Sequence, residues 1–213
     1  MSIILEEISE ALKKGKAKTV KEKVQQAIDE GIPPKTILDD AMLKSMGEIG
    51  VKFKANEIFV PEVLVAARAL NAGLAILEPL LAAQGIEPIG TAVIGTVRGD
   101  LHDIGKNLVA MMLRGAGLEV IDAGVDVSTD KFLELAEQNN AQIICMSSLL
   151  TTTMEATGEI IKEMEDRGVR NKYKIMIGGA PVTAEFAKKV NADYYTPDAA
   201  TAAEVAKEIV SSH

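Results

Sequence analysis

The chain has 213 residues, of which 47% are hydrophobic and 25% are charged, which is typical of a globular protein and excludes an intrinsically disordered one. Its net charge of −8, its aromatic content of 3% and its lack of tryptophan argue against nucleic acid as a partner. The length allows one large domain or two domains of about one hundred residues each.

The first part of the chain, residues 1–88, has helical periodicity. Apolar residues recur at spacings of three and four, as they do across residues 4–12. Turns are predicted near Gly15, at residues 30–34 and at residues 54–57, where glycine, proline or polar residues interrupt the pattern. These breaks divide the segment into four helices, and an N-terminal four-helix bundle is the economical way to pack them.

The longest apolar segment, residues 63–85, is interrupted by Arg68, Asn71 and Glu78, so we expect a buried bundle helix and no membrane partner. The N-terminus carries acidic residues directly after a short apolar patch, unlike a secretory signal. The single cysteine, Cys145, lies in an apolar run, which predicts a buried thiol in a reducing compartment. We therefore predict a cytoplasmic protein.

The pattern changes after a linker at residues 84–90, which contains glycine and proline. Short apolar runs then alternate with amphipathic segments, and continuously apolar strands that are each followed by a helix indicate a parallel sheet covered on both faces. Residues 89–213 are therefore predicted to form a flavodoxin-like or Rossmann-like doubly wound α/β domain with a five-stranded parallel sheet. The predicted strands are 91–97, 118–122, 142–147, 173–177 and 193–195, and the predicted helices lie near 104–116, 129–139, 153–167, 183–190 and 199–211.

Three short segments follow predicted strands, where the ligands of such sheets bind. They are GDLHDIG at residues 99–105, SSLLTTT at residues 147–153 and GGAPVT at residues 178–183. The small and hydroxylated residues of the last two segments leave space for a long polar extension of a ligand, whose phosphate could contact backbone N–H groups and helix N-termini. These features do not distinguish the tail of a macrocycle from an ordinary nucleotide.

His102 lies between Asp100 and Asp103 in the first of these segments. Three roles are open for it: a cap or buried polar residue, an acid–base catalyst, or a metal ligand whose second ring nitrogen is held by an aspartate. The chain cannot supply a closed zinc site of histidines and cysteines, because it has one cysteine and only His213 as a second histidine. A metal bound through His102 must therefore bring most of its own ligands, as the metal of a tetrapyrrole-like macrocycle does.

The sequence resembles the cobalamin-binding domains. DLHDIG matches their Asp-x-His-x-x-Gly signature, and Ser147-x-Leu149 and Gly178-Gly179 follow in the order found in that family. The helical first half also resembles the bundle that precedes this domain in cobalamin-dependent methionine synthase. In size, the chain is most similar to the corrinoid proteins that serve methylamines, methanol, betaines or methoxylated aromatics. The resemblance covers nearly the whole chain.

The resemblance implies a relay of residues below the cobalt of cobalamin. His102 would be the lower axial ligand of cobalt in place of the cofactor's own dimethylbenzimidazole, and Asp100 would form a hydrogen bond with it. Thr153 would stand where methionine synthase has a serine. Such a relay would couple the change between methylcob(III)alamin and cob(I)alamin to the uptake of a proton.

The resemblance also implies further contacts with the cofactor. Part of the helical half would cap the methyl group and move aside by a hinge around residues 84–90, although an apolar stripe at helical spacing is equally typical of a plain core. The cap residues would be Phe53, Val60, Val63 and Leu64. The other expected cofactor contacts are Gly99, Leu101, Asp103, Ile104, Gly105, Ser147, Leu149, Thr151, Gly178, Gly179 and Ala199.

By the same resemblance, the protein would be a corrinoid methyl carrier and not a stand-alone enzyme. A substrate-specific methyltransferase would place a methyl group from a methylamine, betaine or methanol on cobalt, and a second methyltransferase would pass it to a thiol or tetrahydrofolate. A reductive activating protein is a third expected partner. The alternatives are a cobalamin-dependent regulator or sensor, the cobalamin subunit of an isomerase, and a flavodoxin-like nucleotide-binding protein, which predicts no need for His102.

Overall fold

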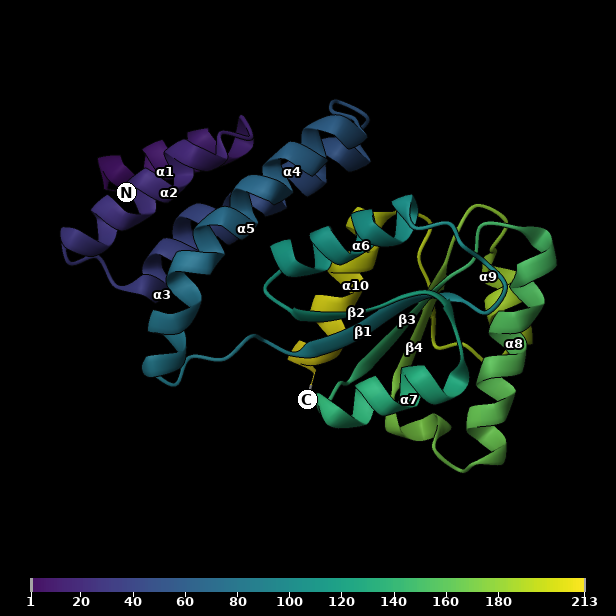
Figure 1. Ribbon diagram of the computed structural model, residues 1–213. Coiled ribbons are helices and arrows are strands. Elements are labelled where there is room, and N and C mark those ends of the chain that lie inside the picture. Colours follow the sequence, from purple (N-terminus) through teal and green to yellow (C-terminus); the bar gives the residue numbers. More distant parts are fainter. Residues whose placement is uncertain (1, 213) are drawn as a thin grey trace. The chain divides into compact units, whose positions relative to one another are not determined.

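The computed structural model describes residues 2–212. These residues form two compact units whose boundary along the chain lies between Pro88 and Ile89, except that the short segment Gly115–Gly117 groups with the first unit. We call the first the helical unit and the second the α/β unit. In Figure 1 the helices of the helical unit are purple to blue, and the strands and helices of the α/β unit are teal to yellow.

The described part of the helical unit contains four helical segments, in agreement with the four predicted helices (Figure 1). The turns between them contain Gly15, Gly31 and Asn56, whose φ angles are positive at 66°, 82° and 57°. Glycine and asparagine tolerate this backbone region, which explains why the helices end there. The segments are α1 (Ile3–Lys13), α2 (Ala17–Asp29), a continuous segment made of α3 (Pro34–Thr36), the π-helical η1 (Ile37–Leu43) and α4 (Lys44–Lys54), and α5 (Val60–Ala83).

Helix α5 contacts α1, α2 and α4, so it is a packing helix of this unit, as predicted. Its buried residues, which include Val63, Leu70 and Leu77, follow one another at helical spacing along one stripe. Among the described residues, α5 is also the one helix that is long and apolar enough by composition to cross a membrane. Core helices of globular proteins have the same property, so its packing within the unit accounts for its composition.

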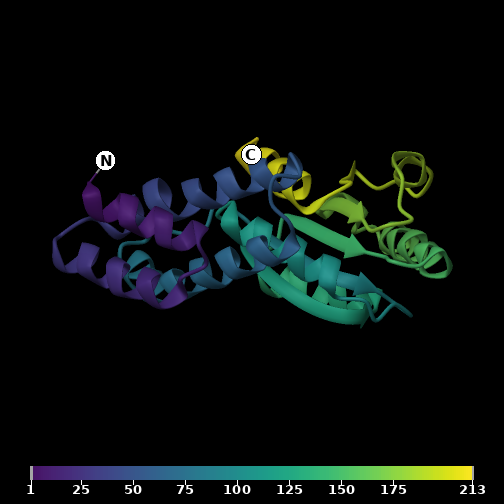
Figure 2. The same cartoon turned by 90° about the horizontal axis from the view of Figure 1, so that it is seen from above.

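Five parallel strands form the sheet in the described part of the α/β unit, in the order β2-β1-β3-β4-β5. Figure 1 shows α6 and α10 on one face of this sheet and α7 and α8 on the other, and Figure 2 shows the strands pointing in the same direction. The predicted doubly wound fold with a five-stranded parallel sheet is therefore confirmed. The strands are β1 (Thr91–Val97), β2 (Glu119–Val127), β3 (Ile143–Ser147), β4 (Lys174–Gly178) and β5 (Tyr194–Tyr195), and the helices are α6 (Ile104–Gly115), α7 (Thr129–Gln138), α8 (Thr151–Asp166), the short 3-10 helix η2 (Arg170–Lys172), α9 (Ala184–Lys189) and α10 (Ala199–Ser211).

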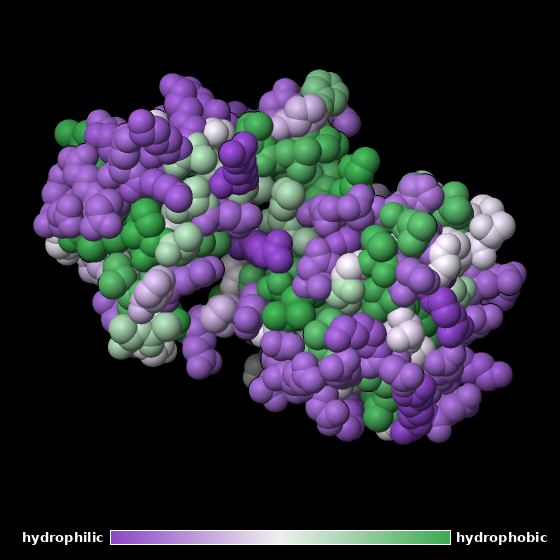
Figure 3. All heavy atoms as spheres, viewed as in Figure 1, coloured by the Kyte–Doolittle hydropathy of each residue, from purple (hydrophilic) through white to green (hydrophobic). Residues whose placement is uncertain are grey.

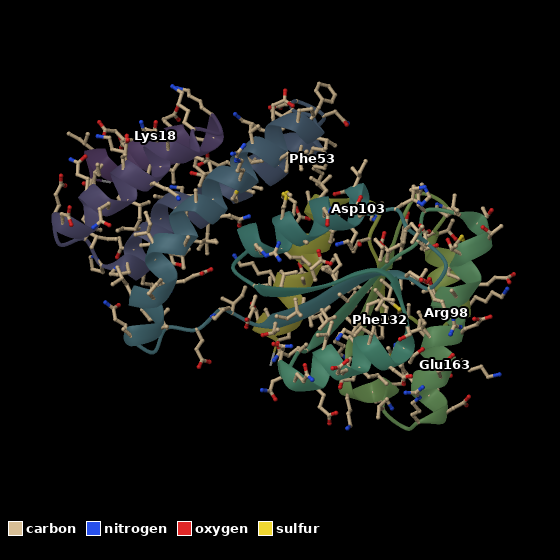
Figure 4. All side chains as sticks on the ribbon, in the orientation of Figure 1. Lys18, Phe53, Arg98, Asp103, Phe132 and Glu163 are labelled. Carbon is tan, nitrogen blue, oxygen red and sulfur yellow. The ribbon has the colours of Figure 1, made fainter. Side chains whose placement is uncertain are left out.

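Packing between α7 and the centre of the sheet explains a glycine inside β1. Phe132 of α7 is fully buried, and a Cβ atom on Gly95 would lie 2.9 Å from its ring (Figure 4). Glycine therefore allows the bulky ring to pack directly on the strand backbone. The pairing of β1 with β2 shifts register on both sides of Gly95, so the same residue also marks an irregularity of the sheet.

In the α/β unit, two predicted boundaries differ from the observed ones by two or more residues, and the others agree within one residue. Strand β2 was expected to end at residue 122 but continues to Val127, and α8 begins at Thr151 and not at residue 153. Gly124 and Asp126 have positive φ angles of 87° and 54°, and glycine and aspartate are weak strand formers. Pairing with β1 across the register shifts nevertheless carries β2 to Val127, which is a tertiary effect that local propensity does not contain.

Candidate functional site

The candidate site lies at the carboxyl ends of β1, β3 and β4. Thr96 of β1 pairs with Ser147 of β3, and Ser147 pairs with Gly178 of β4, so the loops that follow these strands begin at the same edge of the sheet. Because β1 lies between β2 and β3, this edge is the topological switch point at which doubly wound sheets bind ligands.

The loop after β1 carries Asp100 and His102 and runs between Arg98 and Asp103, which are labelled in Figure 4. Asp100 is fully buried, whereas the side chain of His102 is 49% exposed. The Nδ1 atom of His102 lies 2.7 Å from Oδ1 of Asp100, and the backbone N–H of His102 donates to the same oxygen at 3.1 Å. Gly99 has a φ of 81°, which glycine adopts readily, and this turn brings Asp100 beneath the imidazole.

The second carboxylate oxygen of Asp100, Oδ2, accepts the N–H of Leu149 at 2.8 Å and the hydroxyl of Thr153 at 2.7 Å. Burial raises the pKa of Asp100, but the hydrogen bonds from Thr153, Leu149 and His102 together lower it by more, so the net pKa lies well below its usual range. Asp100 is therefore a carboxylate, which only accepts hydrogen bonds, and His102 must carry a proton on Nδ1. The lone pair on Nε2 is then free to bind a metal.

Thr153 connects this pair to a further hydroxyl group. It lies in the first turn of α8, and its Oγ1 atom is 3.0 Å from Oγ of Ser148, which is also buried. A chain of hydrogen bonds thus runs from His102 through Asp100 and Thr153 to Ser148. Sequence reasoning singled out the first three residues and missed Ser148, because a serine beside the end of a strand has no distinctive pattern.

Two residues that sequence reasoning also missed hold the backbone of the loop. The hydroxyl of Thr96 donates to the carbonyl of His102 at 2.8 Å. Asp126, near the end of β2, accepts the N–H of Gly99 through Oδ1 at 2.7 Å, and its own N–H donates to the carbonyl of Asp100 at 3.0 Å. Asp126 lies outside the predicted strand, two residues after Gly124, and no local signal singles it out.

An ion pair between a buried lysine and an exposed aspartate anchors the helix that follows the loop. Lys106, in the first turn of α6, is buried, and its Nζ atom lies 2.5 Å from both carboxylate oxygens of Asp122 in β2. Asp122 also accepts the N–H of Gly124 at 2.9 Å. Asp103, by contrast, is exposed, and its Oδ2 accepts the side-chain amide of Asn107 at 3.2 Å. The start of α6 is therefore tied to the sheet through Lys106.

Gly178 and Gly179 lie where the loops after β3, β4 and β5 approach one another. A Cβ atom on Gly179 would lie 1.9 Å from the carbonyl oxygen of Ser148, and one on Gly178 would lie 3.0 Å from that of Thr196. The N–H of Ser148 donates to the carbonyl of Gly178 at 3.1 Å. The glycine pair is thus required by close contact within the protein itself, and its expected contact with a cofactor stays a prediction.

Exposed apolar side chains accompany the His102 loop. Apart from Ile89, all the large exposed apolar residues of the described α/β unit lie in or next to this loop and its partners. They are Leu101, Ile104, Val125, Leu149 and Leu150. Figure 3 shows hydrophobic residues of the α/β unit at the surface among hydrophilic ones. Such a surface indicates a ligand with a substantial apolar area.

The residues present fit a metal that arrives with its own ligands. Among residues 2–212, no group of three or more His, Cys, Asp or Glu side chains is arranged to hold a metal ion. The loop offers a single half-exposed imidazole with a free Nε2 atom, next to exposed apolar side chains. One axial nitrogen beside an apolar surface suits a flat macrocyclic metal complex such as a corrinoid.

The other predicted contacts of the α/β unit are placed as follows. Ser147 is partly buried as the last residue of β3, and Thr151 is exposed as the first residue of α8. Ala199 is buried as the first residue of α10. Gly105 is exposed, and nothing lies within 4 Å of the place where its Cβ atom would be, so the surface there is open.

The four predicted cap residues lie in the helical unit. Phe53 is partly buried near the end of α4 (Figure 4), and Val60 and Leu64 are partly buried in the first two turns of α5. Val63 is fully buried in the stripe that includes Leu70, so it belongs to the packed core. Their contact with a cofactor stays a prediction.

Comparisons with known proteins agree with this geometry. Two family models, both described as B12 binding domains, match residues 90–206 and residues 4–78. The chain is 39% identical over 207 residues to dimethylamine corrinoid protein 3 of Methanosarcina acetivorans, with 97% of each chain covered. It is 40% identical over 176 residues to trimethylamine corrinoid protein 1 of the same organism, with 82% of each chain covered.

A solved structure is similar over the whole length of the chain. It is a chain of the methanol:cobalamin methyltransferase complex of Methanosarcina barkeri, with a TM-score of 0.89, 30% identity, and coverage of 99% of this chain and 80% of that one. The family matches span both the helical unit and the α/β unit. The chain therefore belongs to the corrinoid proteins with B12 binding domains, and cobalamin is its cofactor.

Proposed function

We propose that this chain is a methyl carrier in which His102 is the lower axial ligand of cobalt. The observation that carries the proposal is the 2.7 Å contact between His102 Nδ1 and the buried carboxylate of Asp100, which leaves Nε2 free on a half-exposed ring. Cobalamin, when bound, supplies a cobalt centre that can accept and release a methyl group. The chain itself supplies the binding surface and the axial nitrogen.

The role of Asp100 would be to orient His102 and to keep the proton on Nδ1. Both oxygens of Asp100 are occupied by donors, which fixes the carboxylate and through it the plane of the ring. The proposal includes the uptake of a proton by this pair when cobalt is demethylated, as the resemblance implies.

The remaining cofactor contacts are part of the same proposal. The exposed apolar residues beside the loop support contact with the macrocycle. Contact of the small residues after β3 and β4 with a tail rests on the resemblance alone. The proposed contacts in the α/β unit are Gly99, Leu101, Asp103, Ile104, Gly105, Ser147, Leu149, Thr151, Gly178, Gly179 and Ala199, and the proposed cap in the helical unit is Phe53, Val60, Val63 and Leu64.

The proposed partners are methyltransferases. The names of the related proteins refer to dimethylamine and trimethylamine, and the similar structure comes from a complex named for methanol, which supports a methylamine or methanol as the methyl donor. A second methyltransferase that acts on a thiol or tetrahydrofolate, a reductive activating protein and a cytoplasmic location complete the proposal.

The ligand assignment is tested by the visible spectrum of the protein reconstituted with hydroxocobalamin. His102→Ala is expected to shift the spectrum of the bound cofactor away from that of a nitrogen-ligated form, because the axial imidazole is lost. His213→Ala is the matched control, since the chain has only two histidines, and it should leave the spectrum unchanged. Identical spectra for wild type and His102→Ala would rule out His102 as the ligand.

The methyl-carrier role is tested separately with a labelled methyl group. The reduced, cofactor-loaded protein is incubated with isotopically labelled dimethylamine, trimethylamine or methanol and the methyltransferase that uses each donor. We expect label to be retained by the protein with at least one methylamine enzyme, and to be lost with His102→Ala. No retained label with any of these enzymes would contradict the proposed donors while leaving the ligand assignment to the spectral test.

A further inference from the structure

The hydrogen-bond chain beneath His102 ends in a residue that the Asp-x-His-x-x-Gly signature does not contain. Ser148 follows the last residue of β3 and is 1% exposed. Its Oγ atom lies 3.0 Å from Oγ1 of Thr153 and 3.3 Å from the carbonyl oxygen of Leu150. A buried hydroxyl must donate its proton to one of these two acceptors.

Ser148 affects the direction in which the hydroxyl of Thr153 donates its proton. The hydroxyl of Thr153 has one proton and three acceptors within reach, Oδ2 of Asp100 at 2.7 Å, the carbonyl of Leu150 at 3.0 Å and Oγ of Ser148 at 3.0 Å. If Ser148 donates to Thr153, it occupies a lone pair on Oγ1. The proton of Thr153 is then free to point to Asp100, and each bond in the series polarises the next.

Without the hydroxyl of Ser148, no donor occupies Oγ1 of Thr153, and the proton of Thr153 can turn either to Asp100 or to the carbonyl of Leu150. The carbonyl of Leu150 already accepts the backbone N–H groups of Thr153 and Met154, both at 3.1 Å, and lies at the start of α8. A rotation of the Thr153 hydroxyl toward that carbonyl would remove one of the four donors to Asp100. The carboxylate would then be held less firmly, and so would the imidazole of His102.

We propose that Ser148 is a positioning residue that directs the hydroxyl of Thr153 to Asp100 and thereby sets how firmly His102 is presented to cobalt. The ordered series is Ser148 to Thr153 to Asp100, with His102 donating from the other side. This inference rests on the proposed role of His102 as the axial ligand, and it extends the relay by one residue into the interior of the α/β unit.

The proposal is tested by a double-mutant cycle of Ser148→Ala and Thr153→Val, which are both close to isosteric. The measured quantities are the dissociation constant of hydroxocobalamin and the fraction of bound cofactor that shows the nitrogen-ligated spectrum. Ser148→Ala is expected to weaken binding about two- to tenfold, the effect of one lost net hydrogen bond. In the Thr153→Val background, Ser148→Ala should have no further effect, because Ser148 acts through Thr153.

A matched control separates this role from the general cost of removing a buried hydroxyl. Ser45 in the helical unit is also 1% exposed, and its hydroxyl donates to the carbonyl of Ala41 at 2.6 Å. Ser45→Ala should leave the spectrum and the affinity unchanged. An unchanged spectrum and affinity for Ser148→Ala would overturn the proposal, and so would an equal loss with and without Thr153, which would indicate packing alone.

A measurement without cofactor keeps the inference distinguishable from the proposed function. With ¹⁵N-labelled histidine, the two rings of the chain are observed by NMR and His102 is assigned with His102→Ala. We expect the Nδ1 proton of His102 to exchange with water about two- to tenfold faster in Ser148→Ala, and only when Thr153 is present. Identical cofactor spectra for wild type and His102→Ala would contradict the axial-ligand proposal, but the exchange rate would still test the role of Ser148. An unchanged exchange rate in Ser148→Ala would overturn the positioning role of Ser148.

Discussion

The two units of the chain bury different kinds of residue. In the described helical unit, Ser45 is the buried polar residue and the rest of the buried positions are apolar. The described α/β unit buries Asp100, Lys106, Ser148 and Thr153 close to the ends of its strands, in addition to its apolar core. Apolar packing tolerates exchange among side chains of similar volume, whereas each buried polar group needs its own partner. The α/β unit therefore carries the specific chemistry.

The polar groups of the α/β unit differ in turn from one another. Lys106 and Asp122 form a closed ion pair that ties α6 to β2. Asp100 instead accepts from four donors, two on His102 and one each on Leu149 and Thr153, and the side chain of His102 stays half exposed. The ion pair is complete within the protein, while the histidine keeps one nitrogen available. The pair of Lys106 and Asp122 therefore stabilises the fold, whereas the pair of Asp100 and His102 is suited to binding a ligand.

The largest effect on stability is expected from a substitution that creates a cavity in the core of the helical unit. Leu70 is fully buried on α5, so Leu70→Ala should lower the free energy of unfolding by about 2–5 kcal/mol. Leu74 lies on the same helix but is partly exposed, and Leu74→Ala should cost less. Urea denaturation followed by circular dichroism measures both. Equal losses for the two variants would contradict the view that packing along the buried stripe stabilises this unit.

A smaller effect is expected from the ion pair between the buried Lys106 and Asp122, whose side chain is 37% exposed. Lys106→Met keeps the volume of the side chain but leaves the carboxylate of Asp122 without its cation, and we expect a loss of about 1.5–3 kcal/mol. The exposed pair of Lys131 and Glu134 is the matched control, and Lys131→Met should cost at most about 1 kcal/mol. Thermal and urea unfolding of the two variants distinguish these values. If Lys106→Met is no more destabilised than Lys131→Met, the anchoring role is wrong.

The smallest effect on stability is expected from lowering the pH, which acts through the charge of Asp100. Its pKa is lower in the folded protein than in the unfolded chain, so the stability that it contributes is fully present above the unfolded pKa of about 4 and is lost as the pH falls further. Between pH 7 and pH 3, the wild type should therefore lose more stability than Asp100→Asn. Urea unfolding at both pH values measures the difference, with the exposed Asp40→Asn as a control for the loss of one carboxylate. A steeper acid loss in Asp100→Asn would reverse the assigned direction.

Features of the fold and the site that have a local signal in the sequence were predicted, and features without one were missed. The strand at Thr91–Val97 was predicted with its observed bounds, because a continuous apolar run followed by a glycine-containing turn is a local signal. The residues alone left Asp100 and Asp103 open as partners of His102, and the resemblance to a family selected Asp100. Thr153 was reached through the resemblance to a family. Asp126 was missed because it acts through a contact with the loop after another strand. Ser148 was missed because a serine after a strand has no distinctive pattern, although its partner Thr153 is only five residues away.

The sequence by itself determined the two units, the order of their elements, the loop that carries His102 and the cofactor class. These depend on periodicity, turn residues and a short signature, all of which are local in the chain. The tertiary structure alone decided that four donors converge on Asp100, that Lys106 is neutralised by Asp122, and that Gly179 is required by the carbonyl of Ser148. These contacts join residues on different strands and loops, and their partners are selected by how the sheet closes and not by neighbours in the sequence.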